Sequence, residues 1–292
     1  MAQPDSNSFV RDNSEFSSNR LKMNDDVELY RTYSTQLHTD NVHFLKRYKS
    51  QIKWKKSGDR SIDLGCGDGR TTSTLEKYLP PNYEVLIGCD LNPNMLKFAN
   101  ATYATDRMKF QVLDMEGDIP ADWREGFDHV FSFHALQWAR NQERAFRNIF
   151  DLLEQGGDCF LVFVARHYVY DIFLNLSMME LWSPYLKNVV DFLSPYHECQ
   201  EPDKKVSDIM EKVGFRHVDV RCKQMVANFS SPESVKRFVL AVNPFAFPTD
   251  LTKEFLDDVE GALRGLCIVS QAEDGQETVK CSYNLLVAYA TK

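Results

Sequence analysis

The residues that decide the fold are Ser61-Ile62-Asp63-Leu64-Gly65-Cys66-Gly67-Asp68-Gly69-Arg70. The apolar start of this stretch predicts a buried strand. Its three alternating glycines predict a tight turn in which no side chain keeps a ligand away from the backbone. Residues 71–78 then predict a helix whose first N–H groups face that ligand. The stretch therefore predicts a ligand-binding turn between a strand and a helix.

Apolar runs and helical patterns alternate after this turn. Strands are expected at 60–64, 84–89, 108–113, 128–133 and 158–165, and helices at 71–78, 93–102 and 142–153. The strands are nearly continuous apolar runs, which is typical of a parallel sheet with helices on both faces. The predicted fold class is therefore α/β, with a doubly wound, mostly parallel seven-stranded sheet of the Rossmann-like kind.

Two amphipathic helices are expected before the first strand. Asp26 to Tyr33 and Thr39 to Lys49 both carry apolar residues at helical spacing. These helices either cap one end of the sheet or close over the ligand, and both roles stay open. Residues 1–22 are polar, lack the apolar run of about 7–15 residues found in a secretory signal, and are expected to be disordered.

Aromatic residues and methionines crowd the chain after the fifth strand. Residues 166–201 predict inserted helices whose side chains either pack the core or form an adaptable apolar pocket, and the pocket is favoured. A helix is expected at 204–213, a strand at 217–229, two helices within 230–266 and a closing strand at 279–290. Asp274-Gly275 suggests a hairpin before that last strand.

These patterns divide the chain into four parts. The first is the N-terminal extension, 1–22, and the second joins the N-terminal helices to the ligand-binding core, 23–165. The third is a helical substrate cap, 166–202 and 230–270, and the fourth supplies the strands that complete the sheet, 203–229 and 271–292.

Charge and cysteine content narrow the class of protein. The chain has 292 residues, a net charge of −8 and 43% hydrophobic residues, so it can bury a core and is not expected to bind nucleic acid or an anionic membrane. Its seven cysteines form no C-x-x-C pair, which predicts neither a zinc site nor a disulfide framework and favours a reducing, cytoplasmic compartment. No metal ligand set is apparent, and no apolar segment approaches the roughly 20 residues of a membrane span.

Acidic residues follow the second and third strands, at the edge where an open α/β sheet binds its ligands. Asp90 comes about 20 residues after the glycine turn, where a carboxylate can accept hydrogen bonds from two ribose hydroxyls. Asp114 suits the exocyclic amine of an adenine, with Met115 covering a ring face. Each acid alone is compatible with a helix N-cap. Together, beside the glycine turn, they favour a cofactor that contains adenosine.

The run Asp63–Gly69 resembles the first motif of the S-adenosylmethionine-dependent methyltransferases. Longer stretches resemble the insect juvenile hormone acid O-methyltransferases, and the similarity runs from about Asp25 to the last strand. The most specific matches are residues 52–56, 63–69, 87–90, 126–133, 142–150 and 194–197. The resemblance implies the class I methyltransferase fold, with S-adenosyl-L-methionine as cofactor and S-adenosyl-L-homocysteine as product. It also implies methylation of the carboxylate of a farnesoid acid, juvenile hormone acid or farnesoic acid.

The resemblance further implies that a Gln amide and a Trp indole orient the substrate carboxylate. Trp138 matches that Trp, and Gln36 lies in the segment of that Gln, although an ungapped alignment puts Leu37 at its position. Cofactor contacts are expected from Asp63, Gly65, Cys66, Gly67, Asp90, Leu91, Asp114, Met115, Ser132 and Phe133. Substrate contacts are expected from Tyr30, Leu37, His134, Gln137, Tyr168, Phe173, Met178, Trp182 and Phe245, of which His134 and Gln137 depart from the family pattern.

This chemistry needs no general base. A carboxylic acid has a pKa of about 4–5, so at neutral pH the substrate is already the nucleophile. Three alternatives stay open: a paralogue acting on another lipophilic acid, a non-catalytic carrier of such acids, and an NAD-dependent dehydrogenase. The glycine spacing disfavours the dehydrogenase, because Gly69 comes one residue too early for G-x-G-x-x-G. The partner is expected to be a lipophilic acid, bound by a monomer or a homodimer.

Overall fold

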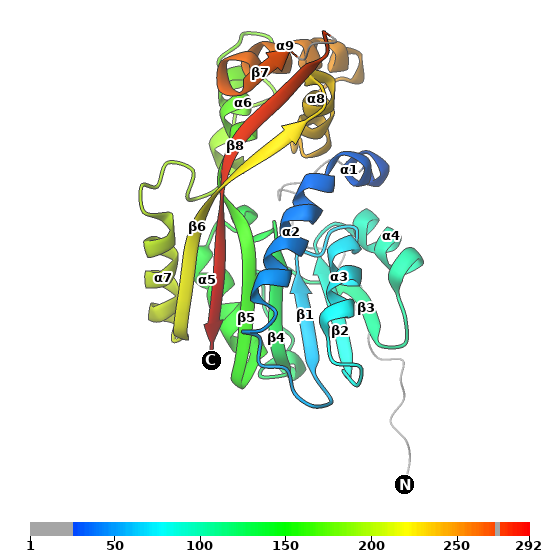
Figure 1. Ribbon diagram of the computed structural model, residues 1–292, viewed down its shortest axis with the longest axis vertical. Helices are drawn as coiled ribbons and strands as arrows, with labels where there is room; N and C mark the ends of the chain where they lie inside the picture. The colour runs from blue at the N-terminus through cyan, green and yellow to red at the C-terminus, as the bar shows by residue number, and fades with distance from the viewer. Residues whose placement is uncertain (1–25, 272–274) are drawn as a thin grey trace.

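A computed structural model describes residues 26–271 and 275–292 of the protein. Its centre is a sheet in the order β3-β2-β1-β4-β5-β8-β6, with β7 paired to β8 beside this path (Figure 1). The strands are β1 (Arg60–Leu64), β2 (Val85–Asp90), β3 (Met108–Val112), β4 (Phe127–Phe133), β5 (Leu153–His167), β6 (Arg216–Phe229), β7 (Ile268–Gln271) and β8 (Glu277–Thr291). Strands β1 to β5 are parallel, and β8 is antiparallel to β5 and β6. The predicted Rossmann-like sheet is confirmed, and the hairpin adds a short eighth strand among the described residues.

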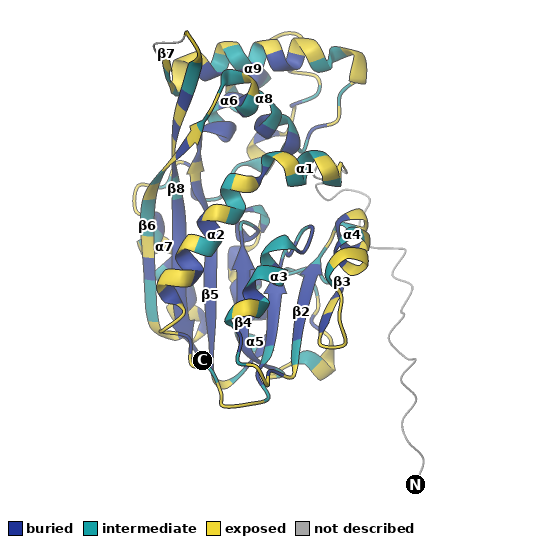
Figure 2. Cartoon of the chain, turned by 45° about the vertical axis from the view of Figure 1, so that its right-hand side comes forward, coloured by how far each residue is buried: buried dark blue, intermediate teal, exposed yellow. Residues whose placement is uncertain are grey.

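Helices cover both faces of this sheet and give the protein two apolar cores. They are α1 (Val27–Tyr33), α2 (Thr35–Tyr48), α3 (Arg70–Leu75), α4 (Pro93–Tyr103), α5 (Gln142–Leu152), α6 (Tyr168–Ser177), α7 (Pro202–Val213), α8 (Pro232–Ala241) and α9 (Thr252–Leu266). Short 3₁₀ helices lie at Glu76–Tyr78, Ala121–Trp123, Leu136–Trp138, Val189–Phe192 and Thr249–Leu251. Alternate residues of β5 enter opposite cores: Phe160 and Val162 join α2, α3 and α4, whereas Leu161 and Phe163 join α5 and α7. The central strands β1, β2, β4 and β5 are accordingly buried along most of their length, whereas the edge strands β3 and β6 are partly exposed (Figure 2).

The two longest C-terminal strands carry the chain out of the sheet and into a cap. β8 pairs with β5 as far as Tyr283, and beyond that residue its partner on this side is β7. Helices α6, α8 and α9 surround this extension at the top of Figure 1. The cap is therefore joined to the sheet by continuous hydrogen-bonded strands, which fixes its position more firmly than a loop would.

One disulfide closes the base of the hairpin in this cap. Cys267, at the C-cap of α9, bonds to Cys281 of β8, with their Cα atoms 4.7 Å apart. The prediction that the cysteines form no disulfide is wrong for this pair, because the pairing of β7 with β8 brings together residues that are 14 positions apart. The remaining cysteines are free thiols, namely Cys66, Cys89, Cys159, Cys199 and Cys222.

Most predicted elements are confirmed within a few residues. The second N-terminal helix starts at Thr35, one turn before the predicted Thr39, because only Ser34 separates it from α1. Residues 166–201 contain one α-helix and one 3₁₀ helix, and the rest of that stretch forms turns. The predicted extension, 1–22, lies outside the described residues. Within the described parts of the chain, no helix combines the length and apolar character needed to cross a bilayer.

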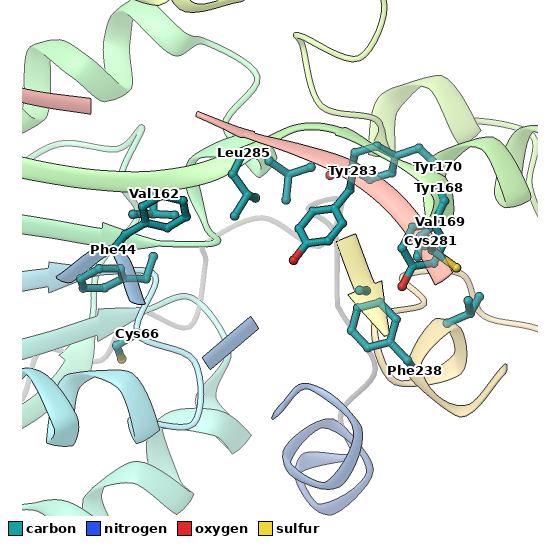
Figure 3. Packing of buried hydrophobic residues seen from close by; sticks show 14 of the residues in the cluster. Phe44, Cys66, Val162, Tyr168, Val169, Tyr170, Phe238, Cys281, Tyr283 and Leu285 are labelled. Atoms are coloured by element: carbon teal, nitrogen blue, oxygen red, sulfur yellow. The ribbon is translucent and has the colours of Figure 1, made fainter. Parts of the chain in front are cut away.

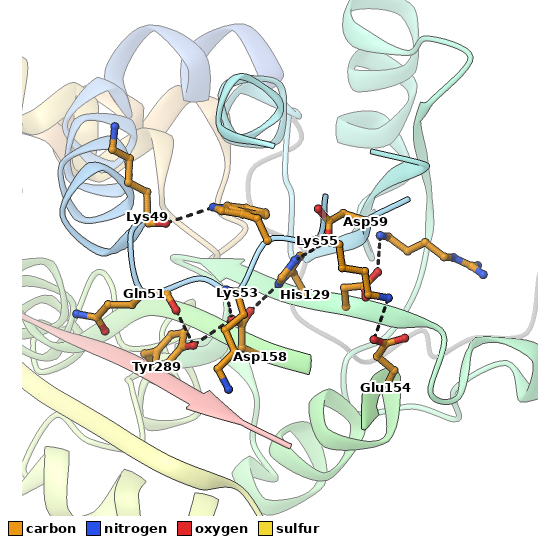
Figure 4. Close-up of polar contacts among 12 residues, drawn as sticks. Lys49, Gln51, Lys53, Lys55, Asp59, His129, Glu154, Asp158 and Tyr289 are labelled. Atoms are coloured by element: carbon orange, nitrogen blue, oxygen red, sulfur yellow. Dashed lines mark hydrogen bonds and ion pairs between the residues drawn. The ribbon is translucent and has the colours of Figure 1, made fainter. Parts of the chain in front are cut away.

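Buried charges tie the amino ends of the parallel strands together, at the edge opposite the glycine turn (Figure 4). His129 of β4 lies 2.6 Å from Asp158 of β5 and 3.1 Å from Asp59, which precedes β1. The backbone N–H groups of Lys53 and Lys55 donate to these same two carboxylates. The stretch 52–56 is one of the most specific matches to the family. In this structure it binds the buried carboxylates that join the strands.

Candidate functional site

The glycine turn joins β1 to α3 through backbone conformations that favour glycine. Gly65, Gly67 and Gly69 have φ values of 76°, 54° and 80°. The N–H groups of Gly65 and Cys66 both donate to the carbonyl of Cys89, at 2.7 and 2.8 Å, which anchors the turn to β2. A Cβ added at Gly65 would collide with the Cβ of Ala135, whereas one added at Gly67 would meet no atom within 4 Å. The absence of a side chain at Gly65 therefore allows Ala135 to pack against the turn, and at Gly67 it leaves open space beside the turn.

Asp90 ends β2 and faces the turn as predicted. Its carboxylate accepts hydrogen bonds from the N–H groups of Gly67 and Asn92, both at 2.8 Å. The N–H of Leu91 also interacts with this carboxylate, which has about four lone-pair sites and so keeps capacity for a further donor. A ribose hydroxyl is a donor that this capacity suits.

Three acidic side chains surround the turn. Asp63 accepts a hydrogen bond from Thr72 at 2.6 Å, while its Oδ1 is buried without a partner within the described residues. Burial raises the pKa of Asp63 to about 6, against the Thr72 hydrogen bond and with repulsion from Asp90 adding to the rise. Burial also raises the pKa values of Asp68 and Asp90. This excess of negative charge suits a ligand that carries positive charge.

The other predicted cofactor residues take different positions. Asp114 follows β3 and accepts a hydrogen bond from the N–H of Glu116 at 2.9 Å. Met115 lies beside the turn, since its methyl carbon would be 3.4 Å from a Cβ at Gly65. Cys66 is buried in the turn, whereas Leu91 is 47% exposed. Asp114 and Met115 thus lie where β3 ends and beside the turn, and the adenine contact expected of them stays a prediction.

Two side chains at the end of β4 contact neighbouring strands. The Ser132 hydroxyl donates to the carbonyl of Leu64 at 2.8 Å, and Phe133 stacks on Phe131 and packs edge-on against Phe160. The cofactor contacts expected from Ser132 and Phe133 stay a prediction, although both side chains are buried in the packing. Alternation along β4 turns both side chains into the packing, so only the backbone at this strand end adjoins the turn.

Trp138 lies at the tip that follows β4, between the glycine turn and the cap. Ala135, three residues earlier, contacts Gly65, and the Trp138 ring packs edge-on against Tyr170 of α6 at 6.4 Å. Its indole N–H makes no hydrogen bond within the part of the chain that the structure describes, and the side chain is half-buried. A buried or half-buried indole normally finds an acceptor, so this donor is available to a ligand.

His134 occupies the same tip in a conformation uncommon for a residue other than glycine, with φ 52°. Its Nδ1 lies 2.7 Å from Oδ1 of Asn41 on α2, and its Nε2 is buried without a partner among the described residues. Burial lowers the pKa of His134 to about 4, so the ring is neutral. Gln137 was predicted to face the substrate, but its amide bridges the backbone of His134 and Val164.

Gln36 lies on α2 next to a buried acid. Its Nε2 donates to Oδ1 of Asp40 at 2.9 Å and reaches the Tyr283 hydroxyl at 3.4 Å. The Tyr283 hydroxyl donates to the other oxygen of Asp40 at 2.5 Å. Burial raises the pKa of Asp40, and the hydrogen bonds from Tyr283 and Gln36 oppose that rise. Figure 3 shows Tyr283 where β8 leaves the sheet, between Leu285 and the cap residue Phe238.

The predicted substrate residues divide into three groups. Phe173, Trp182 and Phe245 are buried in the core of the cap, where the Trp182 indole donates to Asp258. Met178 is 84% exposed, so the pocket position expected for it is wrong. Tyr168 lies at the base of the cap, and its buried hydroxyl has no partner within the described residues. The sequence could not separate these groups, because buried and exposed positions in the aromatic-rich stretch carry the same apolar residue types.

Helix α1 extends across the glycine turn. Arg31 contacts Asp68 of the turn at 3.5 Å, bonds to Tyr103 of α4 at 3.3 Å and covers the Phe98 ring. Burial raises the pKa of Tyr30, and the negative charges of Asp68 and Asp90 add to that rise. Leu37, on α2, is partly buried and packs against the core.

Three polar residues around this site were missed at first: Arg31, Asp40 and Asn41. Asp40 and Asn41 are 2% and 4% exposed. The sequence does contain a signal for Asp40. It is four residues from the buried Phe44 and therefore lies on the apolar face of α2. A carboxylate on an apolar helix face is seldom buried without partners, which marks the position for attention.

Comparisons with known proteins agree with this arrangement. A family model described as a methyltransferase domain matches residues 62–161. Juvenile hormone acid O-methyltransferase of Bombyx mori is 42% identical over 91% of this chain and 97% of its own length. The Drosophila melanogaster enzyme of the same name is 31% identical over 91% of this chain and 92% of its own length.

Solved structures share the fold at low identity. The YcgJ protein of Bacillus subtilis has a TM-score of 0.56 at 15% identity, covering 86% of this chain and 98% of its own. Phosphoethanolamine N-methyltransferase 2 of Haemonchus contortus, solved with S-adenosyl-L-methionine, has a TM-score of 0.51 at 19% identity, covering 87% of this chain and 52% of its own.

The fold, the glycine turn and these matches define the chain as a class I S-adenosylmethionine-dependent methyltransferase. This result decides against the dehydrogenase alternative. Within that class, the chain belongs to the juvenile hormone acid O-methyltransferase family. Its cofactor is S-adenosyl-L-methionine. Among residues 26–271 and 275–292, no group of three or more His, Cys, Asp or Glu side chains is arranged to bind a metal.

Proposed function

We propose that this protein methylates the carboxylate of a farnesoid acid, juvenile hormone acid or farnesoic acid, to give its methyl ester. The observation that carries the proposal is the indole N–H of Trp138, which no described residue accepts, at the tip that joins the glycine turn to the cap. The names of the two insect relatives support the same substrate class. The apolar cap above that tip provides a suitable environment for an isoprenoid chain.

The residues of the turn fit the cofactor. S-adenosyl-L-methionine supplies a methyl group activated by its positively charged sulfur. Asp90 has capacity left for a ribose hydroxyl, and Asp114 and Met115 border the space expected for the adenine. The buried, unpartnered Oδ1 of Asp63 favours a positively charged ligand in this acidic surrounding.

The substrate side of the site needs donors and no base. A farnesoid acid is ionised at neutral pH, so the protein has only to orient one carboxylate oxygen and exclude water. A neutral indole N–H suits this task, because a Lys or Arg partner would stabilise the charged ground state more than a transition state in which that charge is lost. His134 is neutral in its buried position and adds no such charge.

Replacing Trp138 with phenylalanine tests the proposal directly. The Trp138→Phe ring still packs against Tyr170 but lacks the N–H, so kcat/KM for a farnesoid acid should fall about 10- to 100-fold, as expected for a hydrogen bond to a charged group. The measurement is methyl ester formation by mass spectrometry. Trp54→Phe is the matched control, since the Trp54 indole donates to the carbonyl of Lys49 far from this tip. An unchanged kcat/KM in Trp138→Phe would show that the indole N–H does not bind the substrate carboxylate.

The buried acid at Asp63 predicts a pH dependence of cofactor binding. Its pKa is about 6 in the free protein, and a positively charged ligand should return it toward the ordinary value near 4. Binding then requires loss of a proton at low pH, so affinity for S-adenosyl-L-methionine should rise about tenfold from pH 5 to pH 7. Isothermal titration calorimetry measures this rise, and Asp63→Asn should flatten it. Equal affinities at both pH values in the wild-type protein would contradict the assignment.

A further inference from the structure

Asp40 is held in an arrangement that constrains Gln36, the residue predicted to orient the substrate carboxylate together with Trp138. Asp40 is 2% exposed, and no Lys or Arg pairs with it among the described residues. Its two oxygens instead accept from Gln36 and from Tyr283, at 2.9 and 2.5 Å. Burying a carboxylate that only neutral groups hydrogen-bond lowers the free energy of unfolding. A functional role would account for such a carboxylate on the apolar face of α2.

An ionised carboxylate accepts hydrogen bonds and donates none. The Gln36 amide must therefore turn its nitrogen toward Asp40, with one N–H on Oδ1 at 2.9 Å. Its second N–H has only the long contact to the Tyr283 hydroxyl, at 3.4 Å, and that hydroxyl already gives its own hydrogen to Asp40. The arrangement thus leaves the second N–H of Gln36 available to a stronger acceptor.

We propose that Asp40 is a positioning residue, which acts through Gln36 to present an amide N–H, and not the amide carbonyl, to the substrate carboxylate. This inference rests on the proposed function and on the predicted role of Gln36, beside Trp138, in orienting that carboxylate. Without Asp40 the amide is free to rotate by half a turn, and its carbonyl oxygen would then repel the substrate. Tyr283 completes the unit by holding Asp40 from the strand that enters the cap, next to the His167 ring.

The neighbouring residue Asn41 offers a matched control. It is equally buried and lies on the same helix, but its amide contacts His134 and Thr71 and does not contact Gln36. If substitutions at Asp40 and Asn41 lowered turnover only by destabilising α2, both losses would be the same with or without Gln36. Action through Gln36 would make only the effect of Asp40 depend on it.

A double-mutant cycle tests the proposal. Asp40→Asn can present either end of its own amide, so kcat/KM should fall about 10-fold while the dissociation constant of S-adenosyl-L-homocysteine stays within twofold of wild type. In a Gln36→Ala background, Asp40→Asn should cost less than twofold more, whereas Asn41→Ala should keep its full separate effect. Tyr283→Phe should behave as Asp40→Asn does, with a smaller loss, and it serves if Asp40→Asn does not fold.

Each other outcome contradicts a defined statement. Wild-type turnover in Asp40→Asn, or an Asp40→Asn loss that persists in Gln36→Ala, would overturn the inference and leave the proposed function intact. A loss accompanied by weaker S-adenosyl-L-homocysteine binding would make Asp40 a structural residue. Wild-type turnover in Gln36→Ala would show that the amide does not orient the substrate, and it would overturn this inference. The Trp138→Phe variant would then still test the methylation of a farnesoid acid.

Discussion

Gly65→Ala should prevent stable folding of the glycine turn, whereas Gly67→Ala should leave the fold intact and weaken cofactor binding. Both residues have positive φ, which costs an alanine about 1–2 kcal/mol. They differ in surroundings. A Cβ at Gly65 collides with Ala135 of the β4 tip, and relieving that collision should add about 1–3 kcal/mol. A Cβ at Gly67 meets nothing within 4 Å.

The open space at Gly67 lies beside Asp90, whose carboxylate the proposal assigns to a ribose hydroxyl. In Gly67→Ala the added methyl group should therefore reduce the affinity for S-adenosyl-L-homocysteine at least about tenfold, which corresponds to about 1.4 kcal/mol. Thermal unfolding and titration calorimetry separate the two effects. Gly58→Ala is a useful control, because it has a similar φ of 81° and equally open surroundings but lies before β1, away from the turn. Normal cofactor affinity in Gly67→Ala would place the nucleoside elsewhere.

The sequence predicted the sheet and the turn because both depend on local patterns. Alternating glycines after an apolar strand are compatible with few backbone arrangements, and strand-end acids such as Asp90 must lie at the same sheet edge as the turn. Both features follow from the direction of the chain and the alternation of side chains along a strand, and both can be read from the sequence. The structure confirms the strands and the position of Asp90.

Side-chain direction at the ends of elements was harder to predict. Ser132 and Gln137 are polar residues at a ligand-binding edge, yet both bond to neighbouring backbone. The choice between a ligand and a backbone partner depends on which carbonyl or N–H groups another strand brings within reach. In the same way, Cys267 and Cys281 meet only because β7 pairs with β8. Such contacts follow from topology and not from local spacing.

The buried charge cluster at the other edge of the sheet provides the largest expected effect on stability. His129→Gln should lower the free energy of unfolding by about 3–5 kcal/mol, because it leaves the carboxylates of Asp59 and Asp158 buried without a cation. The expected fall in Tm is roughly 10 °C. His43 is exposed, so His43→Gln should change stability by less than about 0.5 kcal/mol and serves as the control.

The effect should depend on pH in a defined direction. Burial alone would lower the pKa of His129, but its hydrogen bonds to Asp158 and Asp59 and the charges of those carboxylates raise it to about 9. An imidazole that binds its proton more tightly when folded stabilises the fold fully below its unfolded pKa of about 6.5, and this contribution is lost as the pH rises toward 9. The stability difference between wild type and His129→Gln, from urea unfolding, should therefore be largest near pH 6 and shrink toward pH 9. A difference that stays constant over this range would mean that His129 is neutral in the folded protein and that the cluster does not hold a buried positive charge.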